Sequence, residues 1–407
     1  MHVAVVDGDV SYPTTSGKRL RTLNLLLKAA RRHQITYVGR CAADSDEARR
    51  APGFLRDHGI EPILVFDPQP KKSGAAFCAR AAANLWSGVP LTVAMHQSAA
   101  MRAAVSKLAR QSRVDVWQVE WPPYLDMISE AIPGPRVAVA HNVDTLLWRR
   151  YYETERNVFK KAFFGMQWHR FRRFEERAFR RAARVIAVTE KDAGLIRDAF
   201  GQPNVDVVDN GIDRAFFASA AGPRDPSRIL YLGALDWWPN LDAVGLLLDR
   251  IFPRVRDLEP GATLAIVGRR PPAALTARVR HTPGVELHAD VADVRPFLGG
   301  CGVMAVPLRI GGGSRLKILE ALASGLPVVA STIGAEGLLL RAGVDYVRAE
   351  EDEMAQALVR AIRAPGEMQE MAQRARGGVL EMYDWDALAM KLEASWERSL
   401  QMSVTRR

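Results

Sequence analysis

The chain has 407 residues, enough for two or three domains of ordinary size, and 48% of its residues are hydrophobic while 25% are charged. This balance excludes an intrinsically disordered chain, and no apolar run is long enough to cross a bilayer. The formal net charge is +10, and the first 220 residues carry all of it, since the remainder holds as many acidic as basic residues. The two halves therefore face different partners, or one of them faces an anionic surface.

The three cysteines, Cys41, Cys78 and Cys301, are few, odd in number and far apart, which predicts a reducing compartment without a disulfide framework. No Cys/His spacing is typical of a zinc site. The opening residues MHVAVVDGDV lack a basic region followed by a long apolar core, so we expect a first strand and not a signal peptide. These features predict a cytoplasmic protein.

Short β-branched runs alternate with longer helical patterns, which predicts parallel sheets with helices on both faces. Strands are expected at 3–6, 36–38, 62–66, 114–119, 137–140, 185–188 and 205–208, and then at 229–232, 263–267, 285–287, 303–306 and 328–330. Helices are expected at 19–31, 99–111, 243–252, 354–362 and 384–400, among others.

A small, polar, proline-bearing segment at 219–227 predicts a linker between two α/β domains. We therefore predict an N-terminal Rossmann-like domain over 1–218, a second one over 228–383, and a final amphipathic helix with its tail over 384–407. Ligands commonly bind in the cleft between two such domains.

The sequence RIGGGSRLKILEALASGLPVVAS, at 309–331, predicts a glycine loop, a helix at 316–323, a turn and a buried strand. A glycine loop that leads into a helix N-terminus leaves backbone N–H groups and the positive end of the helix dipole available to an anion. Arg315 and Lys317 add positive charge there, and Glu320 lies further along the helix. A diphosphate joined to a ribose fits this arrangement.

This segment resembles the donor-sugar motif, Glu-x7-Glu, of the retaining GT-B-fold glycosyltransferases (glycosyl transferases group 1, family 4 type). The second glutamate, which binds ribose in that family, matches Glu320, whereas Gly312 stands where the first is usual. The form GGG[ST]RLKILEA recurs in bacterial members. The resemblance implies that the donor is bound by Gly312, Gly313, Ser314, Arg315, Lys317 and Glu320.

The loop after the first strand, DGDVSYPTTSGKRLRTLNLL, places three cations at a helix start, where they oppose the dipole unless an anion is bound. It is not a Walker A loop, because Arg19 follows Gly17-Lys18 and Tyr12 replaces the expected glycine. Alone, the loop favours a solvated basic helix start. It also resembles the first loop of the glycosyltransferases, which implies that Gly17, Lys18 and Arg21 face the donor phosphates.

His141 follows the predicted strand at 137–140, at the edge of a parallel sheet that usually carries function. Family members have a histidine after the corresponding strand, near the anomeric carbon and the acceptor. The resemblance therefore implies that His141 and Asn142 are catalytic-site groups, and it leaves open whether His141 orients the sugar or handles a proton. No enzymatic nucleophile is identified.

The second domain begins with YLGALDWWPNLDAV, which lacks the Gly-Arg turn and the later Lys-Gly that often grip phosphate in the family. We hypothesise that Arg315 and Lys317 supply that charge instead. The resemblance implies that Gly233 and Asn240 also bind the donor. The resemblance also implies that backbone groups around Gly268 hold the nucleobase. Trp237 and Trp238 are expected to be core residues and to form the cleft wall, in preference to stacking on a base.

Residues 148–184 carry 12 basic and 4 acidic side chains, interleaved with aromatic residues at helical spacing. One interpretation is a helix with its aromatics inward and its basic face solvated. The charge also suits an anionic membrane surface or a lipid-diphosphate acceptor, so we hypothesise peripheral docking through this segment. No recognised nucleic-acid module accompanies the charge, so no nucleic-acid partner is expected.

These observations predict a two-domain α/β fold, and the resemblance implies that it is of the GT-B type with a last helix that crosses back to the first domain. The resemblance implies a retaining, hexosyltransferase-like enzyme that moves a sugar from a nucleoside-diphosphate sugar to a hydroxyl of a carbohydrate or lipid-linked acceptor, in bacterial polysaccharide or glycolipid synthesis. It would need no metal and no cofactor beyond that co-substrate, and would work in the cytoplasm at the inner face of the membrane. The alternatives are an epimerase or phosphorylase on the same fold, and a non-catalytic nucleotide-sugar-binding protein.

Overall fold

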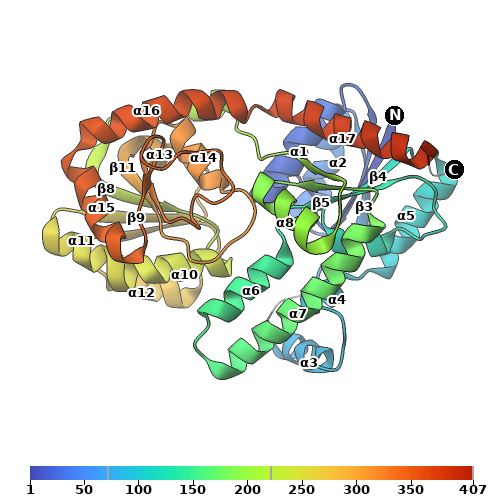
Figure 1. Ribbon diagram of the computed structural model, residues 1–407, viewed down its shortest axis with the longest axis horizontal. Coiled ribbons are helices and arrows are strands. Elements are labelled where there is room, and N and C mark those ends of the chain that lie inside the picture. The colour runs from blue at the N-terminus through green and yellow to red at the C-terminus, as the bar shows by residue number, and fades with distance from the viewer. Residues whose placement is uncertain (71–72, 221, 406–407) are drawn as a thin grey trace. The chain divides into compact units, whose positions relative to one another are not determined.

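The computed structural model describes residues 1–70, 73–220 and 222–405, which form two compact units (Figure 1). Unit 1 comprises Met1–Asn210 with Trp385–Arg407, and unit 2 comprises Gly211–Asp384. The segment expected to be a linker, 219–227, therefore lies inside unit 2, and its last three residues already belong to strand β8, which begins at Asp225. Residue 221 of that segment lies outside the described residues.

Unit 1 is built on a parallel seven-stranded sheet with the strand order β3-β2-β1-β4-β5-β6-β7. Along β1, Val3 and Val5 pack into one apolar cluster, while Ala4 and Val6 pack into another. Both faces of the sheet are therefore buried, which is why its strands read as continuous apolar runs. The strands are β1 (His2–Asp7), β2 (Gln34–Cys41), β3 (Ile60–Phe66), β4 (Val116–Val119), β5 (Arg136–Ala140), β6 (Arg184–Ala187) and β7 (Val205–Val207).

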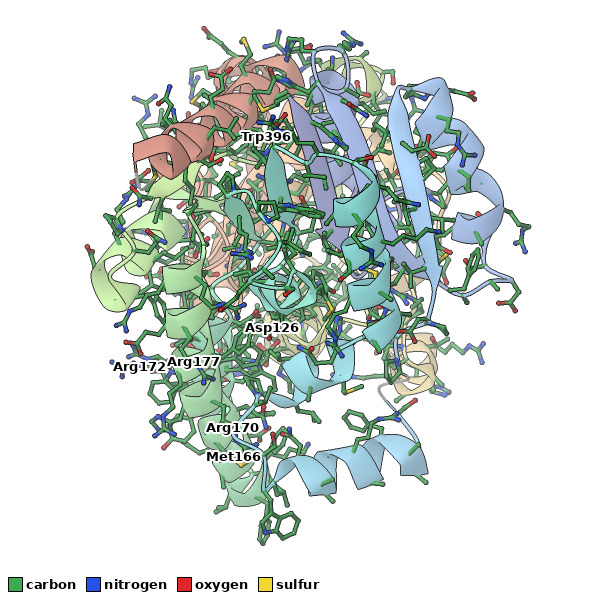
Figure 2. All side chains as sticks on the ribbon, turned by 90° about the vertical axis from the view of Figure 1, so that its right-hand side faces the viewer. Asp126, Met166, Arg170, Arg172, Arg177 and Trp396 are labelled. Atoms are coloured by element: carbon green, nitrogen blue, oxygen red, sulfur yellow. The ribbon has the colours of Figure 1, made fainter. Side chains whose placement is uncertain are left out.

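The helices of unit 1 cover both faces of this sheet. Residues of α1, α2 and α17 share the cluster of Val3 and Val5, and residues of α5, α7 and α8 share the other. The last helix thus packs on unit 1, as the family resemblance implied, with Trp396 fully buried (Figure 2). The helices are α1 (Gly17–Ala29), α2 (Asp46–Asp57), α3 (Ala75–Asn84), α4 (Leu91–His96), α5 (Ala99–Gln111), the 3₁₀-helix Pro122–Met127, α6 (Asp144–Thr154), α7 (Val158–Arg181), α8 (Glu190–Phe200) and α17 (Trp385–Thr405).

The start of α6 is capped by a side chain from α7. The N-cap residue of α6 is Val143, whose apolar side chain accepts no hydrogen bond. Instead, the backbone N–H groups of Asp144 and Thr145 donate to the two carboxylate oxygens of Glu175, at 2.7 and 2.9 Å. Glu175 is buried, so this bidentate cap satisfies two helix N–H groups that have no intrahelical acceptor.

Replacing Glu175 with alanine is expected to lower the free energy of unfolding by about 2–3 kcal/mol, because two buried N–H groups lose their acceptor. Denaturant unfolding followed by circular dichroism measures this change. The neighbouring Glu176→Ala variant is the control, because Glu176 pairs with Arg180 at the surface and is expected to change stability by less than about 0.5 kcal/mol. Equal losses from the two variants would show that the cap does not stabilise the unit.

Unit 2 contains a parallel six-stranded sheet with the strand order β10-β9-β8-β11-β12-β13. Four successive residues of β8, 229–232, are all buried, which requires cover on both faces because successive side chains point to opposite sides. The strands are β8 (Asp225–Leu232), β9 (Thr263–Gly268), β10 (Val285–Ala289), β11 (Cys301–Val306), β12 (Val328–Ala330) and β13 (Val347–Arg348).

The helices of unit 2 alternate with these strands. The predicted helix at 243–252 is divided, because a π-helical turn at Leu247–Ile251 follows α10 and Pro253 opens α11. A proline ring cannot continue the preceding hydrogen-bond ladder, which places the break there. The helices are α9 (Arg214–Ala218), α10 (Trp238–Leu246), α11 (Phe252–Leu258), α12 (Ala273–Arg280), α13 (Arg295–Gly300), α14 (Leu316–Ala323), α15 (Glu351–Arg363) and α16 (Pro365–Met382).

Candidate functional site

Each sheet has one point at which the strand order reverses. In unit 1, β1 lies between β2 and β4, and in unit 2, β8 lies between β9 and β11. The loops after two such strands turn to opposite faces of the sheet, which leaves a crevice at their carboxyl ends where ligands of open α/β sheets bind. The site residues predicted from the sequence follow strands at or next to these two points, each set within its own unit.

In unit 2, the glycine loop follows β11 and leads into α14. Gly313 has a φ of 66°, in the left-handed region that favours glycine, and Gly311 has a φ of 157°. A Cβ atom at Gly311 would lie 2.8 Å from the guanidinium of Arg315, so this residue must also be small. No side chain caps the N-terminus of α14, and Ser314 Oγ is buried without a hydrogen-bond partner among the described residues. The helix start therefore retains unused polar groups for a ligand.

Arg315 holds the loop from within. Its guanidinium donates to the carbonyl oxygens of Gly312 and Gly313, and to that of Ile333 at 3.2 Å, and the side chain is only 6% exposed. Glu336 lies 3.9 Å from the same guanidinium. The hypothesis that Arg315 shares the phosphate charge with Lys317 needs correction, because these contacts direct Arg315 at the chain itself.

Lys317 reaches the loop after β8. Its Nζ donates to Asn240 Oδ1 at 2.8 Å and lies 3.4 Å from the hydroxyl of Tyr231 and 4.7 Å from the centre of that ring. Asn240 is in turn fixed by its own Nδ2, which donates to the carbonyl of Ala234 at 2.8 Å. Gly233 leaves room for this contact, since a Cβ atom there would lie 2.8 Å from Lys317 Nζ. Burial lowers the pKa of Lys317 to about 7, and the positive charge of Arg315 adds to the shift.

Glu320 lies one turn along α14 from Leu316, on the same helix as Lys317. Among the described residues, no hydrogen bond or ion pair to its carboxylate is recorded. Burial raises its pKa to about 7, and the Lys317 charge opposes that shift. We call the glycine loop and the N-terminal part of α14, residues 312–320, the mouth of α14. It combines the amine of Lys317 and the carboxyl group of Glu320, which both titrate near neutral pH.

The loops after β9 and β10 form a tight backbone corner beside this mouth. Gly268 accommodates it, because a Cβ atom there would lie 2.0 Å from the carbonyl oxygen of Gly233. Arg270 and Asp290 both have φ near +50°, a strained conformation for non-glycine residues, and the N–H of Arg270 donates to Asp290 Oδ1 at 2.9 Å. Such strain is concentrated at functional sites. Trp237 and Trp238, expected to be core residues, are instead half exposed.

In unit 1, the cations at the start of α1 are neutralised by carboxylates of the chain itself. Lys18 Nζ pairs with Asp7, and Arg19 pairs with Asp9 and, at 2.6 Å, with Glu47. Gly17 is the first residue of the helix, and the side chain of Ser16 caps it. The expectation that these cations need an external anion is therefore corrected, because Asp7, Asp9 and Glu47 supply the negative charge.

Arg21 is likewise occupied inside unit 1. It is 1% exposed and donates to the carbonyl of Val208 at 2.8 Å. Burial lowers the pKa of this guanidinium to about 10, against the charges of Glu120 and Asp209. The structure does not bring Arg21 to the surface of the unit, where a donor phosphate would contact it.

His141 follows β5 and pairs with a buried carboxylate. Its Nε2 lies 3.1 Å from Glu120 Oε2, at the end of β4. The hydroxyl of Thr22 donates to the same oxygen at 2.6 Å, and Gln118 Nε2 donates to the other at 2.5 Å. Gln118 in turn accepts a hydrogen bond from the indole of Trp396, at 2.7 Å.

These contacts fix the protonation of the pair. Burial would raise the pKa of Glu120, but the hydrogen bonds from His141 and Thr22 and the charge of Arg21 outweigh burial and hold the pKa of this carboxyl group below its usual range. Burial lowers the pKa of His141 to about 4, with Glu120 opposing and Arg21 adding to the shift. At neutral pH the imidazole is therefore neutral, donates Nε2–H to Glu120 and keeps Nδ1 as an acceptor. Asn142 is half-buried beside it.

Sequence reasoning missed three residues of these clusters: Glu120, Tyr231 and Gln118. Glu120 directly follows the buried strand VWQV, the same position that singled out His141 after its own strand. Tyr231 carries a hydroxyl within the otherwise apolar run ILYL. The positions of Glu120 and Tyr231 could therefore have been recognised from the sequence alone. The contact of Gln118 with Trp396 joins positions 278 residues apart, so spacing alone does not predict it.

Two family models match the two halves of the chain. The family model "Glycosyltransferase Family 4" matches residues 19–216, and the model "Glycosyl transferases group 1" matches residues 226–364. The chain is a GT-B glycosyltransferase. The glycosyltransferase is 25% identical to a glycogen synthase of Mycobacterium tuberculosis over 388 residues, which cover 92% of this chain and 88% of the relative.

Solved structures share the fold of this glycosyltransferase. HepE of Anabaena, in complex with UDP and glucose, matches with a TM-score of 0.66 and 16% identity, covering 98% of this chain and all of that chain. Sucrose-phosphate synthase of Thermosynechococcus elongatus matches with a TM-score of 0.72 and 14% identity over 98% of each chain. No helix in the described part of the glycosyltransferase is long and apolar enough to span a membrane.

Proposed function

We propose that this glycosyltransferase takes its sugar from a nucleoside-diphosphate sugar bound at the mouth of α14 and transfers it, with retention of configuration, to a hydroxyl acceptor. The observation that carries the proposal is Lys317, held against Asn240 beside a helix N-terminus that no side chain caps. A leaving diphosphate develops negative charge, which backbone N–H groups and an ammonium group stabilise where they are already in place. The UDP and glucose held by HepE, whose fold this chain shares, support this donor class.

Glu320 is proposed to accept a hydrogen bond from the ribose of the donor, and the corner at Gly268 is proposed to hold the base. In unit 1, neutral His141 is proposed to contact the reacting sugar through the ring nitrogen that Glu120 leaves unprotonated. In the transfer, the bond from the anomeric carbon to the diphosphate breaks and the acceptor oxygen bonds to that carbon. The acceptor's proton leaves with the diphosphate or to solvent.

We further propose that transfer needs no metal ion, because Lys317 and the helix dipole provide the charge that a metal would supply. The acceptor is proposed to be a carbohydrate or a lipid-linked hydroxyl, in bacterial polysaccharide or glycolipid synthesis in the cytoplasm. Adding a chelator to the transfer assay tests metal independence, and a lost rate that Mg²⁺ restores would reject it.

A screen of nucleoside diphosphates and their sugars by thermal shift tests donor binding. A ligand at 100 times its Kd adds about 2.7 kcal/mol to stability. Product analysis then separates the alternatives: an epimerase converts the donor without an acceptor, a phosphorylase needs inorganic phosphate, and a non-catalytic binder consumes no donor. Absence of a stabilising nucleotide would overturn the proposal.

Donor binding is expected to depend on pH in two opposing ways. A diphosphate favours the protonated form of Lys317, so binding takes up a proton and weakens as pH rises above about 7. A ribose hydroxyl favours the ionised form of Glu320, so binding releases a proton and strengthens as pH rises toward about 7, above which the free carboxyl group is already ionised. In Glu320→Gln only the first effect remains, so its affinity for a nucleoside diphosphate should fall by up to about tenfold per pH unit above 7. Titration calorimetry between pH 5 and 9 measures this. Below pH 7 the wild type should gain more affinity with rising pH than the variant does, and parallel profiles over that range would contradict the assignment of Glu320.

A further inference from the structure

Helix α3 leaves an apolar surface uncovered on unit 1. Residues 75–83 are exposed or half-buried, and this stretch contains one charged residue, Arg80. Directly after the helix, Leu85 is 49% exposed and Trp86 is 87% exposed. An apolar helix normally buries a face against its own core, and a large exposed tryptophan beside it is typical of an interaction surface.

The N-terminal end of α7 carries further exposed apolar side chains. Most aromatic residues of α7 pack inward or against α6, as one interpretation of the sequence predicted, but Phe159 is 87% and Val158 76% exposed. Arg170 ties the two helices together by donating to the carbonyls of Asn84 and Leu85, at 2.8 Å each. Figures 1 and 2 agree that α3 lies beside α7 at one end of unit 1, and the contacts of Arg170 place the C-terminal end of α3 against the middle of α7.

Exposed cations accompany the apolar side chains. Among the described residues, no carboxylate partner is recorded for five exposed basic residues of this region: Arg156, Lys160, Arg172, Arg173 and Arg177. Arg172 and Arg177 lie along α7 in Figure 2, further from its N-terminus than Met166. Elsewhere on the same hairpin, basic residues are paired, as in Arg149 with Glu153 and Arg180 with Glu176.

We propose that this docking surface, formed by residues 75–86 and the exposed side of 156–177, binds an anionic lipid bilayer. Tryptophan and phenylalanine side chains partition into the headgroup region, while arginine and lysine contact lipid phosphates. The combination favours a bilayer over a nucleic acid, because exposed tryptophan and phenylalanine side chains accompany the exposed cations of this region. The docking surface is separate from the proposed donor site at α14. Membrane binding and donor binding can therefore be tested independently of each other.

Sedimentation of the full chain with vesicles tests the proposal. At low salt, we expect at least tenfold stronger binding to vesicles of 70% phosphatidylcholine and 30% phosphatidylglycerol than to pure phosphatidylcholine. The triple variant R172E/R173E/R177E should weaken that binding by at least tenfold, since each cation near an anionic surface contributes about fivefold. The double variant W86A/F159A, which keeps the charge, should weaken it severalfold.

The matched control is R254E/R280E/R348E, which reverses three exposed arginines of unit 2 and should bind like the wild type. Equal binding of the wild type to neutral and anionic vesicles would overturn the proposal, as would equal losses in the control and in R172E/R173E/R177E. Binding to single-stranded RNA without vesicle binding would assign the surface to nucleic acid instead. Each variant is also tested for its thermal shift with the nucleoside diphosphate, which should be retained, so that loss of donor binding or of folding is recognised separately.

Discussion

Replacing Lys317 with methionine is expected to lower kcat/KM for the donor by about 10²–10³-fold, equivalent to about 2.7–4 kcal/mol of transition-state stabilisation. Methionine keeps the length of the side chain and removes its charge. The ammonium is held by Asn240 at 2.8 Å, so it is oriented before the donor arrives and need not be ordered during reaction. Steady-state kinetics with the donor found in the thermal-shift screen measure the effect.

Arg280→Met is the matched control for this substitution, because Arg280 is an exposed cation of unit 2 on α12. It should leave kcat/KM within about twofold of wild type. If Lys317→Met behaves like the control, the diphosphate is not bound by this amine. If both variants lose activity equally, the effect is that of net charge and not of the α14 mouth.

Replacing His141 with alanine is expected to lower kcat by about 10²–10⁴-fold, with a smaller effect on donor KM, because the variant loses the neutral imidazole that we propose contacts the reacting sugar. Glu120→Gln should cost less, about 10–100-fold, since the side chain still contacts Nε2 but no longer fixes which ring nitrogen carries the proton. Its pH–rate profile should shift, which a purely structural role would not cause.

His58→Ala serves as the control, because His58 is an exposed histidine of unit 1 whose ring contacts the carbonyl of Phe54. It should retain the wild-type rate. Full activity of His141→Ala, with the Glu120→Gln profile unchanged, would show that this pair supports the fold and takes no part in the reaction.

The sequence predicted the parallel sheets well, because strands covered on both faces must be apolar along their whole length. All twelve expected strands are present, whereas β13, which is two residues long and ends on the exposed Arg348, carries no such signal. The helix at 316–323 was likewise predicted correctly. The division of the helix expected at 243–252 was not predicted, because the apolar periodicity continues without a break through the π-helical turn at Leu247–Ile251, just before Pro253.

The functional clusters were predicted in part, because sequence position fixes the sheet edge on which a side chain lies but not which partner it finds. Lys317 and Asn240 were both predicted, and the structure joins them. Arg315, two residues from Lys317, turns back onto its own loop. From the sequence alone, charged residues near the start of a helix cannot be divided into those that bind a ligand and those that bond to their own loop. That division requires the positions of the surrounding backbone carbonyl groups.

A crystal structure with the nucleoside diphosphate that gives the largest thermal shift tests the central claim most directly. We predict the diphosphate within hydrogen-bonding distance of Lys317 Nζ and of the first backbone N–H groups of α14, with a ribose hydroxyl on the Glu320 carboxylate. A diphosphate bound elsewhere on the chain, with the mouth of α14 still empty, would contradict it.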